Sequence, residues 1–224
     1  MAKKKIVKSK KEFSSTKVII SLIVIVILAF GAYLIFKNRS GNNKQAYKGN
    51  VTDIVMQNGE IVSYKYNNFQ FVKKDNSWYT QIQKGSQPYI IGFTYGPINL
   101  EDININFNDN YFPALTTPGS KVYLTFDHDS TNGSYIATAA INLITNMKTV
   151  YGINASRACL KNSTSCAGAP IVNCASKPNN AVIEFLESNE TSVTYAANCL
   201  TIRGQKDDFI RETEKIILNW YGIA

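Results

Sequence analysis

The residues from Val18 to Phe36 form an uninterrupted run of 19 residues that carries no charge. An α-helix rises 1.5 Å per residue, so this run makes a helix of about 28 Å, close to the ~30 Å hydrocarbon core of a bilayer. Every face of that helix is apolar, which does not fit a helix that covers a soluble core with one side only. We therefore predict one transmembrane helix at residues 18–36.

The flanks of this run indicate its orientation. Residues 1–17 hold seven lysines and one acidic residue, an excess that the C-terminal flank does not match. The positive-inside rule then places residues 1–17 in the cytoplasm and the C-terminal part of the chain outside. A cleavable signal peptide with a small-residue site at 29–31 is the alternative, but the apolar run is longer than the 7–15 residues of such signals. Under both interpretations, the chain that follows the apolar run is exported from the cytoplasm.

The net charge of +8 belongs to this N-terminal region and not to the exported part. Residues 38–224 hold 16 basic and 15 acidic residues and are therefore close to neutral. Affinity for nucleic acids depends mainly on basic groups that neutralise phosphates. We expect no nucleic-acid partner for this part of the chain.

The exported part begins with a polar stretch, residues 37–50, which is typical of a flexible tether. A hydrophobic content of 45% is enough for the rest to bury a core. The predicted organisation is a lysine-rich cytoplasmic tail, a transmembrane helix, a tether and one extracytoplasmic domain, at residues 1–17, 18–36, 37–50 and 51–224.

All cysteines fall in the exported domain, as expected where disulfides are stable. They are Cys159, Cys166, Cys174 and Cys199. Four cysteines allow three connectivities, of which we favour Cys159–Cys166 and Cys174–Cys199. The spacing C-x6-C-x7-C-x24-C lacks the close pairs of a zinc site, and no C-x-x-C is present. We predict two disulfides, no metal site and no cofactor.

The first half of the domain has the pattern of an antiparallel β meander. Short runs rich in β-branched and aromatic residues alternate with turn formers such as Asn67-Asn68. The predicted strands are residues 61–66, 69–72, 78–82, 88–95 and 103–107.

The second half has a β-α-β-β-α pattern. A strand at 121–126 leads into an amphipathic helix that can start at Thr131 or Asn132 and stop before Gly152. After the cysteines, we expect strands 181–186 and 193–202 to pair as a hairpin, followed by a helix at about 207–221. The fold class is α+β and not a parallel doubly wound sheet.

The sequence contains no recognisable catalytic motif. His128 is the only histidine, so no histidine cluster or HExxH is present, and neither GxGxxG, GxxxxGK[ST] nor GxSxG occurs. We interpret Asp127, His128 and Asp129 as a turn that precedes a helix, and we predict no catalytic residue. The competing hypothesis is a hydrolase with paired carboxylates, drawn from Glu101, Asp102, Asp109, Asp127 and Asp129.

Several local strings resemble a set of uncharacterised membrane-anchored surface proteins from small-genome archaea. They are residues 78–81 (WYTQ), 95–97 (YGP), 100–103 (LEDI), 126–127 (FD), 198–199 (NC) and 221–223 (YGI). The resemblance covers about residues 64–224, although His128 departs from its pattern. It implies a location at an archaeal cell surface and no activity.

These features favour a non-catalytic domain held at the cell membrane by one helix. Its partners would be the lipid bilayer and other membrane or cell-surface proteins, in contact or envelope assembly. Two alternatives are the hydrolase above and a single-pass subunit of a membrane complex. A small-residue spot at Gly31-Ala32 would suit helix packing in the last case, although no GxxxG is present.

Overall fold

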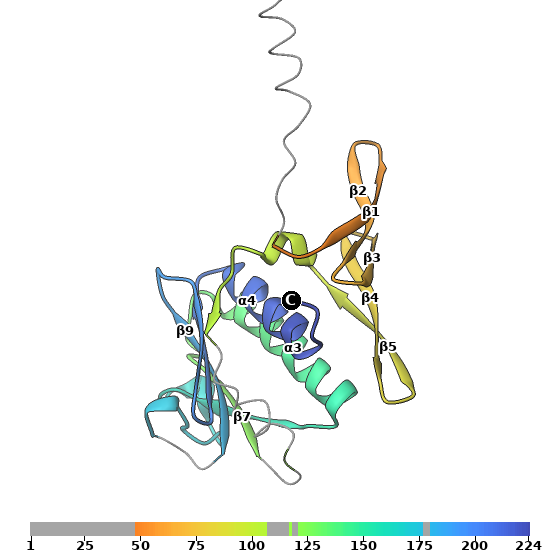
Figure 1. The fold of residues 1–224 in the computed structure, drawn as a ribbon. Coiled ribbons are helices and arrows are strands. Elements are labelled where there is room, and N and C mark those ends of the chain that lie inside the picture. The colour runs from red at the N-terminus through yellow and green to blue at the C-terminus, as the bar shows by residue number, and fades with distance from the viewer. Residues whose placement is uncertain (1–47, 107–116, 118–120, 177–179) are drawn as a thin grey trace, which may run out of the picture. The chain divides into compact units, whose positions relative to one another are not determined.

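The computed structural model describes residues 48–106, 117, 121–176 and 180–224. They form two β-sheets and two long helices, which confirms the α+β prediction (Figure 1). The predicted tail, the predicted transmembrane helix and most of the tether lie outside the described residues. Within the part that the structure describes, no helix is long and apolar enough to cross a membrane.

The first sheet is the predicted antiparallel meander, whose strands pair in the order of the sequence, except that the predicted strand 103–107 lies in the second sheet, where Ile105–Asn106 pairs in parallel with residues 193–194. It contains β1 (Val51–Gln57), β2 (Glu60–Tyr66), β3 (Phe69–Lys74), β4 (Ser77–Lys84) and β5 (Gln87–Phe93). Two-residue turns with positive φ at both positions join successive strands at Asn58-Gly59, Asn67-Asn68 and Asp75-Asn76. Such turns match the twist of antiparallel strands, which is why asparagine and glycine specify this sheet locally. Strand β1 was not among the predicted strands.

The second sheet is mixed and has the strand order β6-β10-β11-β9-β7-β8. Its strands are β6 (Ile105–Asn106), β7 (Val122–Phe126), β8 (Ala155–Cys159), β9 (Ala181–Glu187), β10 (Ser192–Ala196) and β11 (Cys199–Gly204). Strands β8, β7, β9 and β11 run parallel, whereas β10 is antiparallel to β11 and parallel to β6.

The predicted hairpin of residues 181–186 with 193–202 is wrong. The second segment is two strands, β10 and β11, which form their own hairpin around Ala197-Asn198. Ala197 adopts a φ of 52°, a conformation that alanine rarely takes, so the sequence carried no clear turn signal. Strand β9 pairs instead with β11, in parallel.

The predicted β-α-β-β-α pattern also lacked a strand. Residues of β8 were assigned to the cysteine loop, but they pair in parallel with β7 from Val122↔Ala155 to Phe126↔Cys159. The sequence of β8, ASRAC, is short and only weakly apolar. It forms a strand because the preceding helix returns the chain to the edge of β7.

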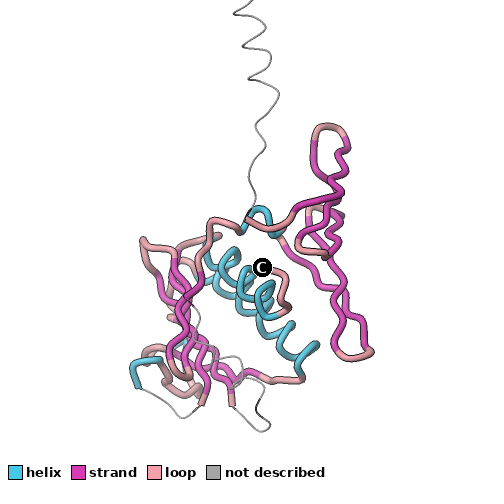
Figure 2. Tube along the Cα trace, in the orientation of Figure 1, coloured by secondary structure: helices cyan, strands magenta, loops and turns pink. Residues whose placement is uncertain are grey.

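Two helices agree with the sequence prediction (Figure 2). Helix α3 (Gly133–Tyr151) follows Asn132 and ends at Gly152, whose φ of 69° and N–H bond to the Lys148 carbonyl close the helix. Helix α4 (Asp208–Trp220) carries Phe209, which packs edge-on against Phe185 of β9 at 5.9 Å between ring centroids. Short 3₁₀ helices η1 (Pro97–Leu100), η2 (Thr164–Cys166) and η3 (Cys174–Ser176) lie in connections.

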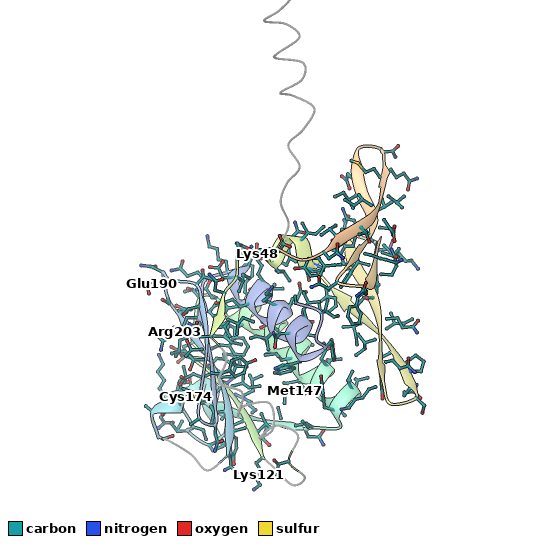
Figure 3. The ribbon with its side chains drawn as sticks, in the orientation of Figure 1. Lys48, Lys121, Met147, Cys174, Glu190 and Arg203 are labelled. Carbon is teal, nitrogen blue, oxygen red and sulfur yellow. A yellow bond between two sulfur atoms is a disulfide. The ribbon has the colours of Figure 1, made fainter. Side chains whose placement is uncertain are left out.

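One hydrophobic core joins the two helices to the inner faces of both sheets. Met147 of α3 is 1% exposed within it, whereas Lys48, Glu190 and Arg203 lie at the outside (Figure 3). Large side chains from the meander and the mixed sheet, including Phe71 and Ile183, belong to the same cluster. The meander is therefore part of the domain and not a separate module.

The opposite face of the mixed sheet is covered by the segment that follows β8. Glu184 of β9 and Thr201 of β11 are neighbours in register and are both buried. The amide of Cys174 donates to Glu184 at 3.3 Å, and Thr201 Oγ1 lies 3.5 Å from the Cys174 sulfur. Both faces of this sheet are thus covered.

Helix α4 places one buried carboxyl group toward each sheet. Glu214 accepts hydrogen bonds from the amides of Thr94 and Tyr95, directly after β5, at 2.6 and 2.8 Å. Glu212 lies against β11, where a Cβ on Gly204 would stand 3.2 Å from Glu212 Oε2. Burial raises the pKa of Glu212 to about 9 and that of Glu214 to about 7. The hydrogen bonds from Thr94 and Tyr95 oppose the rise at Glu214.

Candidate functional site

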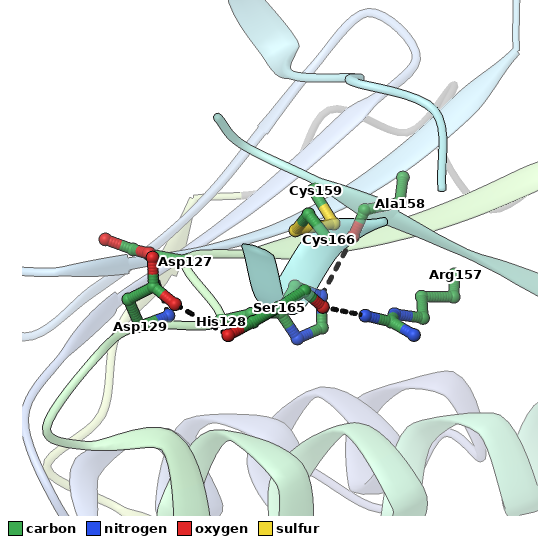
Figure 4. Close-up of a disulfide and its surroundings, with 8 residues drawn as sticks. All are labelled: Asp127, His128, Asp129, Arg157, Ala158, Cys159, Ser165 and Cys166. Carbon is green, nitrogen blue, oxygen red and sulfur yellow. Dashed lines mark hydrogen bonds between the residues drawn. A yellow bond between two sulfur atoms is a disulfide. The ribbon is translucent and has the colours of Figure 1, made fainter. Parts of the chain in front are cut away.

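A group of interacting polar side chains lies where the parallel strands β7 and β8 end. The register Phe126↔Cys159 brings the residues that follow β7 beside those that follow β8. Carboxyl ends of parallel strands are where open α/β sheets usually bind ligands. We call this group the β7–β8 edge; it comprises Asp127, His128, Asp129, Cys159, Lys161, Ser165 and Cys166. Figure 4 shows all of these residues except Lys161.

Both disulfides expected from the sequence are present in the structure. Cys159 pairs with Cys166 at a Cα–Cα distance of 6.2 Å, and Cys174 pairs with Cys199 at 5.7 Å. These are the two pairs favoured above, and they leave no free cysteine among the described residues. The first closes the loop at the β7–β8 edge, and the second holds the covering segment to β11.

His128 lies directly beside the first disulfide. Its ring contacts the Phe126 ring at 3.9 Å between centroids, and Nε2 lies 3.3 Å from the Ala158 carbonyl oxygen. One ring nitrogen and the sulfurs of Cys159 and Cys166 all lie within 4.8 Å of one another. The sequence did not predict this group, because its members are brought together by the pairing of β7 with β8.

The acidic residues of this edge form ion pairs or accept hydrogen bonds from neighbouring side chains. Asp127 forms an ion pair with Lys161 at 2.7 Å, and the hydrogen bond from Lys161 lowers the pKa of Asp127. Asp129 accepts a hydrogen bond from Ser165 at 2.8 Å. Glu187, at the end of β9, accepts from Ser130, which lowers the pKa of Glu187. Groups arranged in this way bind cations or fix loops, and the lowered pKa of Asp127 does not suit a general acid.

The other carboxylates proposed for hydrolysis also have hydrogen-bond or ion-pair partners. Glu101 accepts a hydrogen bond from the Gly49 amide at 2.9 Å, and Asp102 pairs with Arg211 of α4 at 2.8 Å. Burial raises the pKa of Asp102, but the hydrogen bond and charge of Arg211 outweigh it and lower the pKa. Asp109 lies outside the described residues. Neither Asp127 nor Asp102 therefore has the raised pKa that protonates a glycosidic oxygen.

A second feature is a groove of about 260 Å³ between the meander and the ends of the helices. It is lined by Phe69, Ile82, Gln83, Lys84, Val150, Tyr151, Trp220 and Tyr221. Lys84 Nζ stands 3.8 Å from the centre of the Tyr151 ring, and the Tyr151 hydroxyl donates to the Trp220 carbonyl at 2.9 Å. The first contact attaches the β4–β5 hairpin to α3, and the second joins the end of α3 to the end of α4.

The third feature is the outer face of the meander, which we define as Gln70, Val72, Tyr79, Gln81 and Ile90. A shallow hollow of about 300 Å³ is lined by these five side chains and Thr80. Of eight large hydrophobic residues exposed in the described part of the chain, six lie on the meander, and Ile90 is the most exposed at 75%. The sequence alternation showed which face is buried, but not that Val72, Tyr79 and Ile90 come together on the other face.

Comparisons with family models, curated proteins and solved structures found no match for this chain.

Proposed function

We propose that this chain is a membrane-anchored protein whose extracytoplasmic domain is non-catalytic and binds another envelope protein through the outer face of the meander. Residues 18–36 would be the anchor and residues 1–17 the cytoplasmic tail. The resemblance to membrane-anchored archaeal surface proteins agrees with this location and adds no activity.

The observation that carries this proposal is the concentration of exposed apolar side chains on one sheet. Val72 and Tyr79 are direct neighbours in register and are 46% and 36% exposed. On the neighbouring strand β5, Ile90 is in register with Gln81 of β4. A contiguous surface of aliphatic and aromatic groups with amides between them has the composition of a protein interface. None of the side chains that line the hollow on this face is charged, which makes a nucleic-acid or acidic-polymer ligand a poorer fit.

The carboxylates argue against the hydrolase alternative. A glycosidase needs one carboxyl group protonated at neutral pH and a second one across a cleft. Asp102 and Asp127 instead have lowered pKa values and basic partners. A single-pass subunit of a membrane complex would use the same outer face, with its helix adding a second contact.

The interface is tested by site-specific photo-crosslinking of the full chain in native membranes. A photoreactive residue at Ile90 or Tyr79 is expected to give a discrete adduct with one partner. The matched control is Ile141, which lies on α3 and is 62% exposed, outside the proposed interface. Equal adducts from Ile141, or none from Ile90 and Tyr79, contradict the proposal.

The anchorage has an independent test. Protease added to intact cells is expected to degrade the domain and leave residues 1–17 protected. Deletion of residues 18–36 is expected to move the domain out of the membrane fraction. Protection of the whole chain in intact cells excludes an external location.

A further inference from the structure

At the β7–β8 edge, the side chains of His128, Cys159 and Cys166 have the spacing of an incomplete metal site. Around a tetrahedral zinc ion, bonds of about 2.3 Å to sulfur and about 2.0 Å to nitrogen place the ligand atoms roughly 3.5 Å apart. A nitrogen of His128 and the sulfurs of Cys159 and Cys166 already lie within 4.8 Å of one another. Breaking the sulfur–sulfur bond lets the two sulfurs separate to that distance with little movement of the backbone.

The surroundings hold His128 in a ligand-like position. Phe126 packs against its ring, and Nε2 faces the Ala158 carbonyl oxygen at 3.3 Å. This contact fixes the orientation of the imidazole ring beside the disulfide, as an outer hydrogen bond does for a metal-bound histidine. Cys159 is 0% and Cys166 4% exposed, whereas His128 is partly exposed, so solvent reaches the site from the histidine side.

We propose that reduction of the Cys159–Cys166 disulfide creates a binding site for one zinc-class ion, formed by Cys159, Cys166 and His128. A dithiol reductant gives two electrons and two protons; the sulfur–sulfur bond breaks, two thiols form and the reductant becomes a disulfide. The metal ion then displaces both thiol protons and forms two bonds to sulfur and one to nitrogen. A solvent molecule completes four-coordination.

The metal ion would replace the disulfide as the closure of the same loop. The loop between Cys159 and Cys166 spans seven positions and contains Lys161 and Ser165, both of which hold acidic residues at the end of β7. Closure by either the disulfide or the metal preserves these contacts. Reduced, metal-free protein has neither closure, so its loop is released.

The second disulfide is a built-in control. Cys174 and Cys199 have Glu184 and Thr201 as polar neighbours. Among the described residues, the group at the β7–β8 edge is the one with three candidate ligands in reach. Reduction of Cys174–Cys199 therefore yields two thiols without an imidazole partner.

The test is titration of the full-length protein with Co²⁺ and Zn²⁺ under a phosphine reductant and in its oxidised form. The reduced protein is expected to bind one Co²⁺ with thiolate-to-cobalt charge-transfer absorption, which Zn²⁺ abolishes. His128→Ala is expected to weaken Co²⁺ binding at least ten-fold, and Cys159→Ser with Cys166→Ser to remove it. Cys174→Ser with Cys199→Ser is expected to leave it unchanged.

A second readout does not depend on absorption or on variants. Trypsin is expected to cleave after Lys161 in the reduced, metal-free protein, and Zn²⁺ is expected to slow this cleavage at least ten-fold. Absence of binding by the reduced protein overturns the proposal. So does binding that survives Cys159→Ser with Cys166→Ser, that is equal in the oxidised form, or that is indifferent to His128→Ala.

Discussion

The two sheets share one core but differ in what covers their outer faces. In the mixed sheet, five successive residues of β9 are buried, because α4 packs on one face and the segment held by Cys174 packs on the other. In the meander, β4 alternates between buried and exposed residues, and its outer side chains contact solvent. The mixed sheet therefore has both faces covered, whereas the meander leaves exposed the apolar surface that we propose as the interface.

The same contrast appears in the two acids of α4. Glu212 faces the mixed sheet, and burial raises its pKa to about 9. Glu214 accepts hydrogen bonds from two backbone amides at the end of the meander, and its pKa is raised only to about 7. Four predictions test how far the two sides differ.

The largest effect is expected from Glu212→Gln. The folded state favours the protonated acid, so its contribution to stability is complete below pH 4.5 and is lost as the pH rises to about 9. One pKa unit corresponds to about 1.4 kcal/mol, which makes the loss at most about 6 kcal/mol. The free energy of unfolding, measured by urea denaturation from pH 5 to 9, should fall less steeply in the variant. Equal slopes would show that Glu212 does not remain neutral.

The disulfides come second. Loop entropy gives a cost of about 3.5 kcal/mol for replacing Cys174 and Cys199 by serine, whose separation is 25, and about 2.5 kcal/mol for Cys159 and Cys166, separated by 7. The Cys174–Cys199 disulfide also holds the segment that covers the mixed sheet, so its loss is expected to destabilise the fold further. Thermal denaturation of both double variants measures the difference. The opposite order would contradict the covering role of residues 160–176.

The third prediction compares one residue type on the two outer faces. Val182 of β9, beside Cys199, is 0% exposed, and Val72 of β3 is 46% exposed. Val182→Ala is expected to cost about 2–3 kcal/mol through lost burial and a cavity. Val72→Ala is expected to change the free energy of unfolding by less than about 0.5 kcal/mol. Similar costs in chemical denaturation would mean that the meander face is covered after all.

The smallest effect concerns the attachment of the meander to the helices. Lys84→Ala removes the contact with the Tyr151 ring and is expected to cost about 0.5–1 kcal/mol. Lys74→Ala, at the exposed end of β3, is the control and should be neutral. The two variants are compared by their urea midpoints. If Lys84→Ala does not change the urea midpoint, packing in the hydrophobic core is the main attachment of the meander to the helices.

The sequence predicted most of the structure that local signals specify, although β1 was missed despite the Asn58-Gly59 turn that follows it. Two-residue turns such as Asn67-Asn68 defined the meander, and Asn132 and Gly152 bounded α3 within a clear helical period. The order of the mixed sheet depends on pairing between distant segments, which periodicity does not encode. The largely apolar sequence of β9, interrupted by Glu184, is typical of a strand covered on both faces and could have argued against a simple hairpin.

The candidate sites were predicted unevenly for the same reason. Cysteine count and compartment suggested the disulfides, and their favoured pairing needed only spacing. The approach of His128 to Cys159 depends on the parallel register of β7 with β8, across a crossover helix. Because β8 was not predicted as a strand, this register could not be inferred from the sequence.

The position of β11 between β9 and β10 has a consequence for biogenesis. Both neighbours precede β11 in the chain, so a nascent polypeptide that has emerged only to Ala196 has an empty slot in the middle of its sheet. The inner edges of β9 and β10 then offer unpaired amides and carbonyls. The meander, built from consecutive hairpins, can assemble as it emerges. A chaperone or the translocation machinery would therefore have most to protect in the interval before residues 199–204 are delivered.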